Sequence, residues 1–389
     1  MLRRAVKRER PLVVHVTTTD MSLDWLLGPQ LVAFQAAGYE VIGMSAAGEH
    51  VANLTAMGIE HVDVPAFTRS NNPLHDLRAF GQLVRLFRSL RPDIVHTHNP
   101  KPGILGRIAA RLTRTPLVVN TQHGLWAQPA DRWQRRIPVY AAERIAAAFG
   151  DVELVQNPED VDTLVDTLHI PARRVRLLGN GVDLSRFDPS VVGAETRNRL
   201  RAEWGIDDGE VVCAVVGRLV REKGIVELLE AAHDLARDGV PARFVVIGPT
   251  DPDKSDAIDA SVFDRATADG VVLTGTRHDM PECYAAADLF VTASWREGFP
   301  RSAMEAAAMG LPTVATDIRG NRQVIADGET GLLVPVRDPA GIRAAVEQLV
   351  TDADLRASMG AAARARSAAE FDQQLIIDRT LAAYALVPR

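Results

Sequence analysis

Two glutamates, Glu297 and Glu305, flank the turn-forming stretch Gly298-Phe299-Pro300 with seven residues between them. The apolar run 288–292 before them predicts a short buried strand, and the alanine-rich run 301–309 predicts a helix. Glu297 is therefore expected in a loop at the carboxyl end of a strand, where open parallel sheets bind ligands. Because a carboxylate repels phosphate, both glutamates are expected to accept hydrogen bonds from sugar or ribose hydroxyls. The alternative is a capped surface helix with two solvated glutamates.

Two cations, Arg218 and Lys223, lie between the predicted strand 211–216 and a helix that begins near Gly224. The free amides and the dipole of a helix start already favour an anion. Arg218 can hold two phosphate oxygens with its planar guanidinium, and Lys223 adds a compact positive charge. The pair therefore predicts a phosphate-bearing ligand, and a solvated loop is the alternative.

In the first half of the chain, His123 follows the predicted strand 116–120 and is expected at the ligand-binding edge of the sheet. His98 and Lys101 follow the neighbouring strand and are expected to contact an anionic acceptor. His96 alternates with His98 along this strand and is expected to be buried. A structural role is the alternative for a lone histidine.

These side chains need strands that end at a common edge of a sheet. Short β-branched apolar runs alternate with helical segments, which predicts parallel, doubly wound sheets. The predicted strands are 12–17, 40–45, 59–64, 93–97, 116–120, 152–156, 175–178, 211–216, 243–247, 271–274, 288–292 and 313–316. The fold class is therefore α/β, with two doubly wound, Rossmann-like domains facing each other across a cleft. We expect the domains at 1–190 and 191–370, with a C-terminal helix in 371–389 that packs back on the first domain.

The composition, 47% hydrophobic and 24% charged over 389 residues, suits a globular protein of two domains. Two cysteines are too few for a disulfide framework or a zinc site. No apolar run reaches the roughly 18 residues of a transmembrane helix, and the run 11–16 is too short for a signal peptide. We therefore expect a cytoplasmic protein. The net charge is −6, but the first half has a basic excess that suits an anionic acceptor or surface. No nucleic-acid partner is expected.

An ordered series of motifs covers roughly residues 211–336. Its members are Gly217-Arg218, Glu222-Lys223-Gly224, Tyr284–Asp288, the pair Glu297 and Glu305, Ala315–Asn321 and Asp327–Val334. The series resembles the donor-binding domain of the retaining glycosyltransferases of family 4, which have the GT-B fold of two Rossmann-like domains. By this resemblance, Arg218 and Lys223 hold the donor diphosphate, and Glu305 takes the ribose hydroxyls. Glu297 and the backbone of 298–300 take the sugar and its phosphate.

The same resemblance places the nucleotide base against the loop Gly275-Thr276-Arg277. It implies no cofactor and no catalytic metal, since the nucleotide-sugar is a substrate. Asp251-Pro252-Asp253 has the form of the DxD metal ligand of the other major glycosyltransferase fold. Because it lies in the second half among further aspartates, we expect a solvated loop there.

The first half is similar to family members that extend lipid-linked oligosaccharides for capsule, O-antigen or glycoprotein assembly. The similarity lies in residues 93–103 and 121–125, and in that pattern His123 reaches over the donor sugar. Residues 21–24 depart from the glycine-rich first loop of many members, which leaves the acceptor contacts open.

The expected activity is transfer of a UDP-linked hexose or N-acetylhexosamine, with retention, to a saccharide acceptor that is lipid-linked. A nucleotide-sugar 2-epimerase of the same fold is the main alternative, although the spacing of Glu297 and Glu305 argues against it. A phosphorylase with pyridoxal phosphate and a non-catalytic sugar-binding protein are further alternatives.

Aromatic and basic residues follow His123, namely Trp126, Arg132, Trp133, Arg135 and Arg136. We expect a helix here that either contacts an anionic membrane at the inner face of the plasma membrane or packs as an ordinary amphipathic helix.

Overall fold

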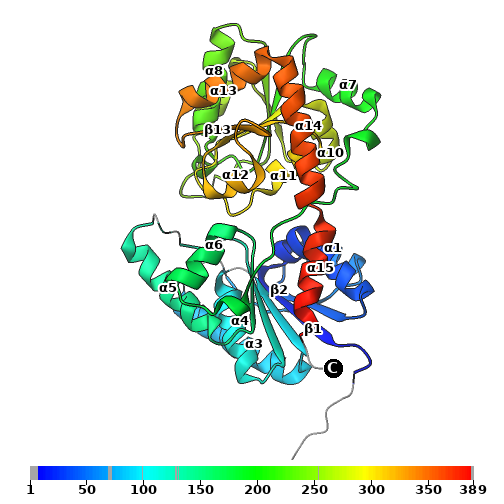
Figure 1. Ribbon diagram of the computed structural model, residues 1–389, viewed down its shortest axis with the longest axis vertical. Coiled ribbons are helices and arrows are strands. Elements are labelled where there is room, and N and C mark those ends of the chain that lie inside the picture. The colour runs from blue at the N-terminus through cyan, green and yellow to red at the C-terminus, as the bar shows by residue number, and fades with distance from the viewer. Residues whose placement is uncertain are drawn as a thin grey trace, which may run out of the picture. The chain divides into compact units, whose positions relative to one another are not determined.

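The computed structural model describes residues 8–68, 72–98, 100–127, 129, 131–252 and 254–386. The chain forms two compact units, which are residues 1–179 with 376–389, and residues 180–375 (Figure 1). Of the sequence predictions, the basic start 1–7, Asn99 of the motif 93–103 and Asp253 of the DxD triplet lie outside the described residues. The prediction of two doubly wound, Rossmann-like units is confirmed.

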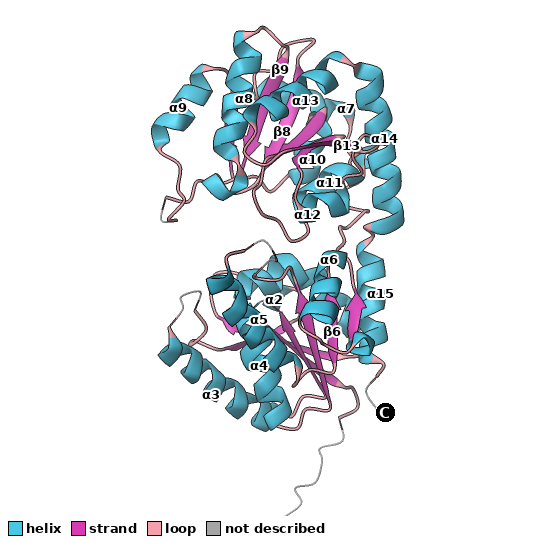
Figure 2. Cartoon of the chain, turned by 60° about the vertical axis from the view of Figure 1, so that its left-hand side comes forward, coloured by secondary structure: helices cyan, strands magenta, loops and turns pink. Residues whose placement is uncertain are grey.

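The first unit has a seven-stranded parallel sheet in the order β3-β2-β1-β4-β5-β6-β7. Its strands are β1 (Leu12–Thr19), β2 (Glu40–Ala46), β3 (Glu60–Asp63), β4 (Ile94–His98), β5 (Leu117–Gln122), β6 (Val152–Val155) and β7 (Val175–Leu177). Its helices are η1 (Ser22–Leu27), α1 (Gly28–Ala36), α2 (Val51–Ala56), α3 (Pro73–Leu90), α4 (Pro100–Leu112), α5 (Trp133–Ala147), α6 (Pro158–Asp162), η2 (Thr163–Thr167), η3 (Ala172–Arg174) and α15 (Gln373–Tyr384). The sheet crosses the unit between two layers of helices (Figure 2).

Alternation along the central strands separates two cores in this unit, because successive side chains of a strand point to opposite faces. Val13 of β1 and Ile94 of β4 pack with α1, α2 and α15 on one face. Val14 and Val95 pack with α3 and α4 on the other. The strands are buried on both faces, which explains why they are continuous apolar runs in the sequence.

The second unit has a six-stranded parallel sheet in the order β10-β9-β8-β11-β12-β13. Its strands are β8 (Val211–Val216), β9 (Ala242–Ile247), β10 (Val272–Gly275), β11 (Leu289–Thr292), β12 (Thr313–Thr316) and β13 (Gly331–Val334). Its helices are η4 (Pro189–Val191), α7 (Ala194–Glu203), η5 (Arg221–Lys223), α8 (Ile225–Arg237), α9 (Ala260–Ala268), α10 (Met280–Ala286), α11 (Arg301–Ala308), α12 (Arg319–Val324), α13 (Pro339–Thr351) and α14 (Ala353–Glu370). Helices α8, α9 and α13 pack on one face, and α7, α10 and α11 pack on the other.

The division between the units differs from the boundary expected at residue 190. Residues 180–190 belong to the second unit because they are built into it: Val182 donates its amide to the carbonyl of Phe371, and Phe187 is buried in that unit's core. The chain returns to the first unit at Ile376, in the first turn of α15. Ile376, Ile377 and Tyr384 of this helix are buried in the core of the first unit.

Candidate active site

The second sheet has a point where its strand order reverses, between β8 and β11. Crossover helices leave these neighbouring strands in opposite directions, which opens a crevice beyond their carboxyl ends. Gly217 to Gly224 follow β8, and Ser294 to Glu297 follow β11. The topology therefore brings together two segments that the sequence singled out.

Gly224 fixes the distance between these two segments. Its φ angle is +67°, a conformation that favours glycine. A β-carbon on Gly224 would lie 1.9 Å from the carbonyl oxygen of Ala293, the residue after β11. The amide of Trp295 also donates to the carbonyl of Glu222, at 2.9 Å. The backbones of the two loops are thus in direct contact, and a side chain at Gly224 would force them apart.

Lys223 and Glu297 meet at this contact. The ammonium group of Lys223 pairs with Oε1 of Glu297, and the hydroxyl of Ser294 donates to the same oxygen at 2.9 Å. Both side chains keep part of their surface in solvent, with exposed fractions of 28% for Lys223 and 18% for Glu297. An incoming phosphate can therefore replace the carboxylate as the partner of Lys223. Glu297 can then accept a hydrogen bond from a ligand hydroxyl.

Glu305 lies in the second turn of α11, and its two oxygens have different partners. The hydroxyl of Tyr284, on α10, donates to one oxygen at 3.1 Å, and Nε of Arg301 donates to the other at 3.1 Å. Burial raises the pKa of Glu305, although the nearby Arg301 acts in the opposite direction. The carboxylate is thus fixed in position by a hydroxyl and a guanidinium, which suits a hydrogen-bond acceptor for a ligand better than a mobile acid.

Arg218 and the loop 275–277 lie at the same edge of this sheet, after β8 and β10. Arg218 is 45% exposed and pairs with Asp251 at 3.2 Å. Asp251, the first aspartate of the DxD triplet, is thus the ion-pair partner of Arg218. Arg277 pairs with both Asp279 and Glu203, and its hydrogen bonds to Asp279 raise its pKa further. Its guanidinium is thus occupied by carboxylates, whereas Gly275 is exposed.

Of the residues expected in the first unit, His123 directly follows β5 and is partly exposed. His98 ends β4 and is 1% exposed. Its two ring nitrogens lie 3.0 Å from Nδ1 of His15 and 3.1 Å from Nε2 of His123. Direct contact between His98 and an acceptor would break one of these hydrogen bonds. Lys101 of α4 forms an ion pair with Asp76 at 2.8 Å. His96 is buried, as expected, and so is His98, because the two lie on the same face of β4.

Four residues that hold these groups were not among the predicted site residues: Ser294, Tyr284, His15 and Tyr384. Ser294 precedes Glu297 by three residues, and this short spacing was a usable signal. Tyr284 belongs to a recognised motif, but its partner Glu305 lies a strand and a loop away. His15 and Tyr384 stand inside apolar runs, where nothing in the sequence marks a polar contact between them.

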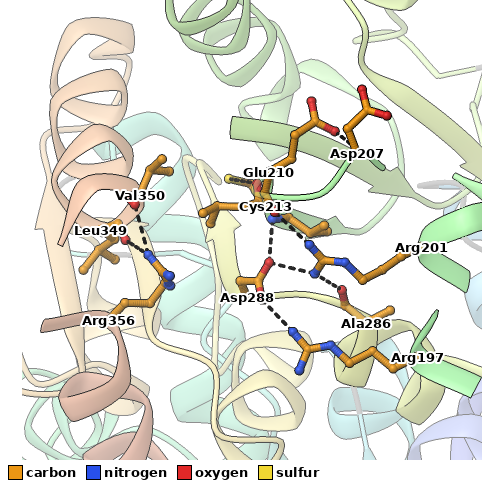
Figure 3. Close-up of polar contacts among 12 residues, drawn as sticks. Arg197, Arg201, Asp207, Glu210, Cys213, Ala286, Asp288, Leu349, Val350 and Arg356 are labelled. Carbon is orange, nitrogen blue, oxygen red and sulfur yellow. Dashed lines mark hydrogen bonds and ion pairs between the residues drawn. The ribbon is translucent and has the colours of Figure 1, made fainter. Parts of the chain in front are cut away.

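One cavity of the second unit lies away from the loops that follow its strands. It has a volume of about 470 Å³ and opens beside Asp288, Arg197 and Arg356, at the amino ends of the strands. Asp288 accepts from Arg197 and Arg201 at 2.9 Å each and from the amide of Val212 at 2.8 Å (Figure 3). The aspartate thereby ties α7 to β8 and β11. Its partners are all internal, which indicates a structural role.

Both units match known families. Residues 196–366 match the glycosyl transferases group 1, and residues 30–186 match Glycosyltransferase Family 4. The chain is 31% identical over 281 residues to the UDP-Gal:alpha-D-GlcNAc-diphosphoundecaprenol alpha-1,3-galactosyltransferase of Escherichia coli, covering 71% of this chain and 70% of that protein. It is 25% identical to the N,N'-diacetylbacillosaminyl-diphospho-undecaprenol alpha-1,3-N-acetylgalactosaminyltransferase of Campylobacter jejuni, covering 92% and 93%.

Among solved structures, Anabaena HepE in complex with UDP and glucose superimposes with a TM-score of 0.80. It is 18% identical in sequence and the match covers 97% of this chain and all of that one. The fold is therefore GT-B, the class of two Rossmann-like units. Within that class the chain belongs to the family-4 glycosyltransferases. The prediction of a glycosyltransferase is confirmed, and the family favours transfer over epimerisation.

Proposed function

We propose that the protein transfers a hexose or N-acetylhexosamine from a UDP-sugar, with retention, to a lipid-linked saccharide during synthesis of a cell-surface polysaccharide or glycan. Two relatives support the acceptor class, because their names specify diphosphoundecaprenol-linked sugars. The UDP bound in the HepE structure supports the donor class.

The observation that carries this proposal is the meeting of Lys223 and Glu297 at the strand-order reversal. Departure of a diphosphate leaves negative charge on its oxygens, and preorganised cations there stabilise the transition state more than the ground state. Lys223 and Arg218 supply this charge in the proposal, which then needs no metal ion. Glu305 accepts from the ribose hydroxyls, and Glu297 accepts from the sugar once phosphate has taken its place on Lys223.

Retention in this scheme follows a front-face displacement. The acceptor hydroxyl attacks the anomeric carbon as the bond to the diphosphate breaks. The departing phosphate oxygen takes the proton of that hydroxyl. No side chain then needs to act as nucleophile, which agrees with the fixed, hydrogen-bonded state of Glu305.

A peripheral membrane contact through α5 is the second part of the proposal. No helix among the described residues is long and apolar enough to span a bilayer. Trp133, Ile137 and Ile145 of α5 are 58–63% exposed on one side of the helix. The charges on the exposed part of α5 are all positive, since its one acidic residue, Glu143, is buried. Apolar side chains among positive charges are the surface that an anionic bilayer attracts.

The donor part is tested with the full chain and a set of nucleotide-sugars. A UDP-sugar is expected to raise the unfolding temperature, because it binds the folded state alone. Transfer to a diphosphoundecaprenol-linked saccharide is then measured for Lys223→Ala and Arg218→Ala. Each is expected to lower kcat about 100-fold, the order found for the loss of one preorganised donor.

Arg221→Ala is the matched control, because Arg221 is an exposed arginine of the same loop. It should retain activity close to that of the unmodified protein. Full transfer by the Lys223→Ala, Arg218→Ala double variant would refute the assignment of the leaving-group site.

A further inference from the structure

A row of buried polar rings runs through the first unit behind His123. His15 of β1, His96 and His98 of β4, and Tyr384 of α15 are each at most 2% exposed. All lie on the sheet face covered by α1 and α15, because His15 pairs in register with His96 and the strand period is two. His123 is the partly exposed end of this row.

The rings form a continuous chain of five hydrogen bonds. His123 Nε2 lies 3.1 Å from His98 Nδ1, and His98 Nε2 lies 3.0 Å from His15 Nδ1. His15 Nε2 lies 3.2 Å from the hydroxyl of Tyr384, which lies 2.6 Å from His96 Nδ1. His96 Nε2 lies 2.7 Å from the hydroxyl of Thr121. Every ring nitrogen of the three inner histidines is thus used once.

Burial keeps these rings neutral. Desolvation lowers the pKa of His15 to about 3 and that of His123 to about 4. The pKa values of His96 and His98 are lowered by desolvation first and by the neighbouring histidines second. The nearest further titratable group is Tyr39, whose ring centroid is 5.6 Å from that of Tyr384.

A row of neutral imidazoles has a direction, because each ring carries one N–H and one bare nitrogen. If Nδ1–H of His98 donates to His123, then His98 must accept from His15, and His15 must accept from Tyr384. If His123 donates instead, every bond in the row is reversed. A mixed arrangement leaves one bond with two protons or with none, or makes the Tyr384 oxygen accept on both sides so that its own O–H has no acceptor in the row; each case costs a buried hydrogen bond.

We propose that this row fixes which ring nitrogen of His123 carries its proton, and that His98, His15 and Tyr384 are positioning residues for the transfer reaction. The second ring nitrogen of His123, Nδ1, is buried, and the row holds it as a donor or as an acceptor of fixed sense, together with the Gln156 side chain that hydrogen-bonds to His123. His123 acts as a neutral hydrogen-bonding group and exchanges no net proton. The inference rests on the proposed function for the role of His123 toward substrate, while the row itself stands on the geometry of the first unit.

A metal site is the competing interpretation of His15, His96 and His98, which bring ring nitrogens within 4.8 Å of one another. One observation favours the hydrogen-bonded row: every ring nitrogen of these three histidines already has a hydrogen-bond partner.

The test uses the full chain with ¹⁵N-labelled histidine, because nitrogen chemical shifts distinguish a protonated ring nitrogen from a bare one. All four histidines are expected to be neutral, each in a single tautomer, with one direction along the row, between pH 6 and 8. Tyr384→Phe removes the hydroxyl that links His15 to His96 and should change the tautomer ratio of His123 by about fivefold. That ratio corresponds to one hydrogen bond of about 1 kcal/mol.

Thr121→Val removes the hydroxyl at the opposite end of the row. It provides a second test in case Tyr384→Phe does not fold. Tyr39→Phe is the control, since it removes a hydroxyl in the same aromatic cluster but outside the row. An unchanged His123 tautomer in both folded row variants would overturn the proposal. Shifts of the His15, His96 and His98 nitrogens on adding zinc chloride would overturn it in favour of a metal site.

Activity gives a second readout. Tyr384→Phe is expected to lower kcat about fivefold with little change in the KM for donor, while Tyr39→Phe leaves both unchanged. The spectra need no substrate. The spectra can therefore refute the proposed role of the row even if a UDP-sugar binds, and they can support it even if no UDP-sugar binds.

Discussion

At the scale of single residues, the site depends on a glycine as much as on its charged groups. Lys223 reaches Glu297 because Gly224 allows the loop after β8 to touch the backbone after β11. A second glycine, Gly320, serves the same end: a β-carbon there would lie 2.6 Å from the carbonyl oxygen of Glu297. The position of the carboxylate is thus set by backbone contacts on two sides.

Gly224→Ala is therefore expected to destabilise the second unit and to abolish the thermal shift caused by a UDP-sugar. Gly205→Ala is the matched control, because Gly205 has a similar φ of +64° but no atom within 4 Å of its would-be β-carbon. The control should cost only about 1–2 kcal/mol for the left-handed conformation, whereas Gly224→Ala adds the clash. Thermal unfolding measures both, and equal losses would show that the contact with Ala293 is unimportant.

The site residues of the second unit could be predicted from the sequence because they are close in sequence to strand ends. Lys223, Glu297 and Glu305 each follow a recognisable strand or begin a recognisable helix. Tyr384 and His15 were not accessible. Their contact joins the first strand to the last helix, and sequence periodicity carries no information about contacts at that separation.

At the scale of elements, α5 is shorter than predicted, because the sequence indicated a single helix that included Trp126. The helix begins at Trp133, and Trp126 lies in the loop before it. Arg135 donates to the carbonyl of Trp126 at 3.0 Å, and Arg136 donates to that of Pro129. The two arginines therefore hold the loop against the first turns of the helix, which keeps both tryptophans near one end of α5.

The double variant Trp133→Ser, Ile137→Ser is expected to bind vesicles containing anionic phosphatidylglycerol at least several-fold more weakly, since binding scales with buried apolar area. Co-sedimentation with vesicles of varied phosphatidylglycerol content measures this. Val191→Ser, at a residue of η4 that is 66% exposed, is the control for a general loss of surface apolarity. A vesicle affinity that changes neither with the substitutions nor with the lipid charge would exclude α5 as the membrane contact.

At the scale of the whole molecule, the two sheets repeat one topology, with the first three strands in reverse order and the remaining strands in sequence. Strand and helix alternation predicted this architecture in both halves. The boundary at 180 was not predicted, because it is set by the contact of Val182 with Phe371 rather than by composition. The helices α13 and α14 were not predicted either. The two units thus share a strand order, apart from the seventh strand of the first, but they differ in their buried titratable groups.

This difference predicts unequal responses to acid. The histidines with lowered pKa values are the buried His15, His96 and His98 and the partly exposed His61 and His123, and all of them lie in the first unit. Between pH 6.5 and about 4 the unfolded chain binds protons that the folded unit excludes. Stability is therefore fully present above pH 6.5 and falls on acidification, by about 1.4 kcal/mol per pH unit for each such histidine.

Hydrogen exchange measured by mass spectrometry at pH 7.5 and at pH 5 separates the two units. Peptides of β1, β4 and β5 should lose protection at the lower pH before those of β8 and β11, after correction for intrinsic exchange rates. Simultaneous loss in both sheets, or earlier loss in the second, would contradict the assignment of acid sensitivity to the histidine row.

The return of the chain through α15 has a consequence for how the protein is made. Tyr384 and Ile376 complete the core of the first unit, yet they are translated only after the entire second unit. The unit that leaves the ribosome first is thus finished last, and until then His15 and His96 lack the tyrosine hydroxyl that links them. The histidine row behind His123 is therefore completed only in a chain whose second unit has already been synthesised.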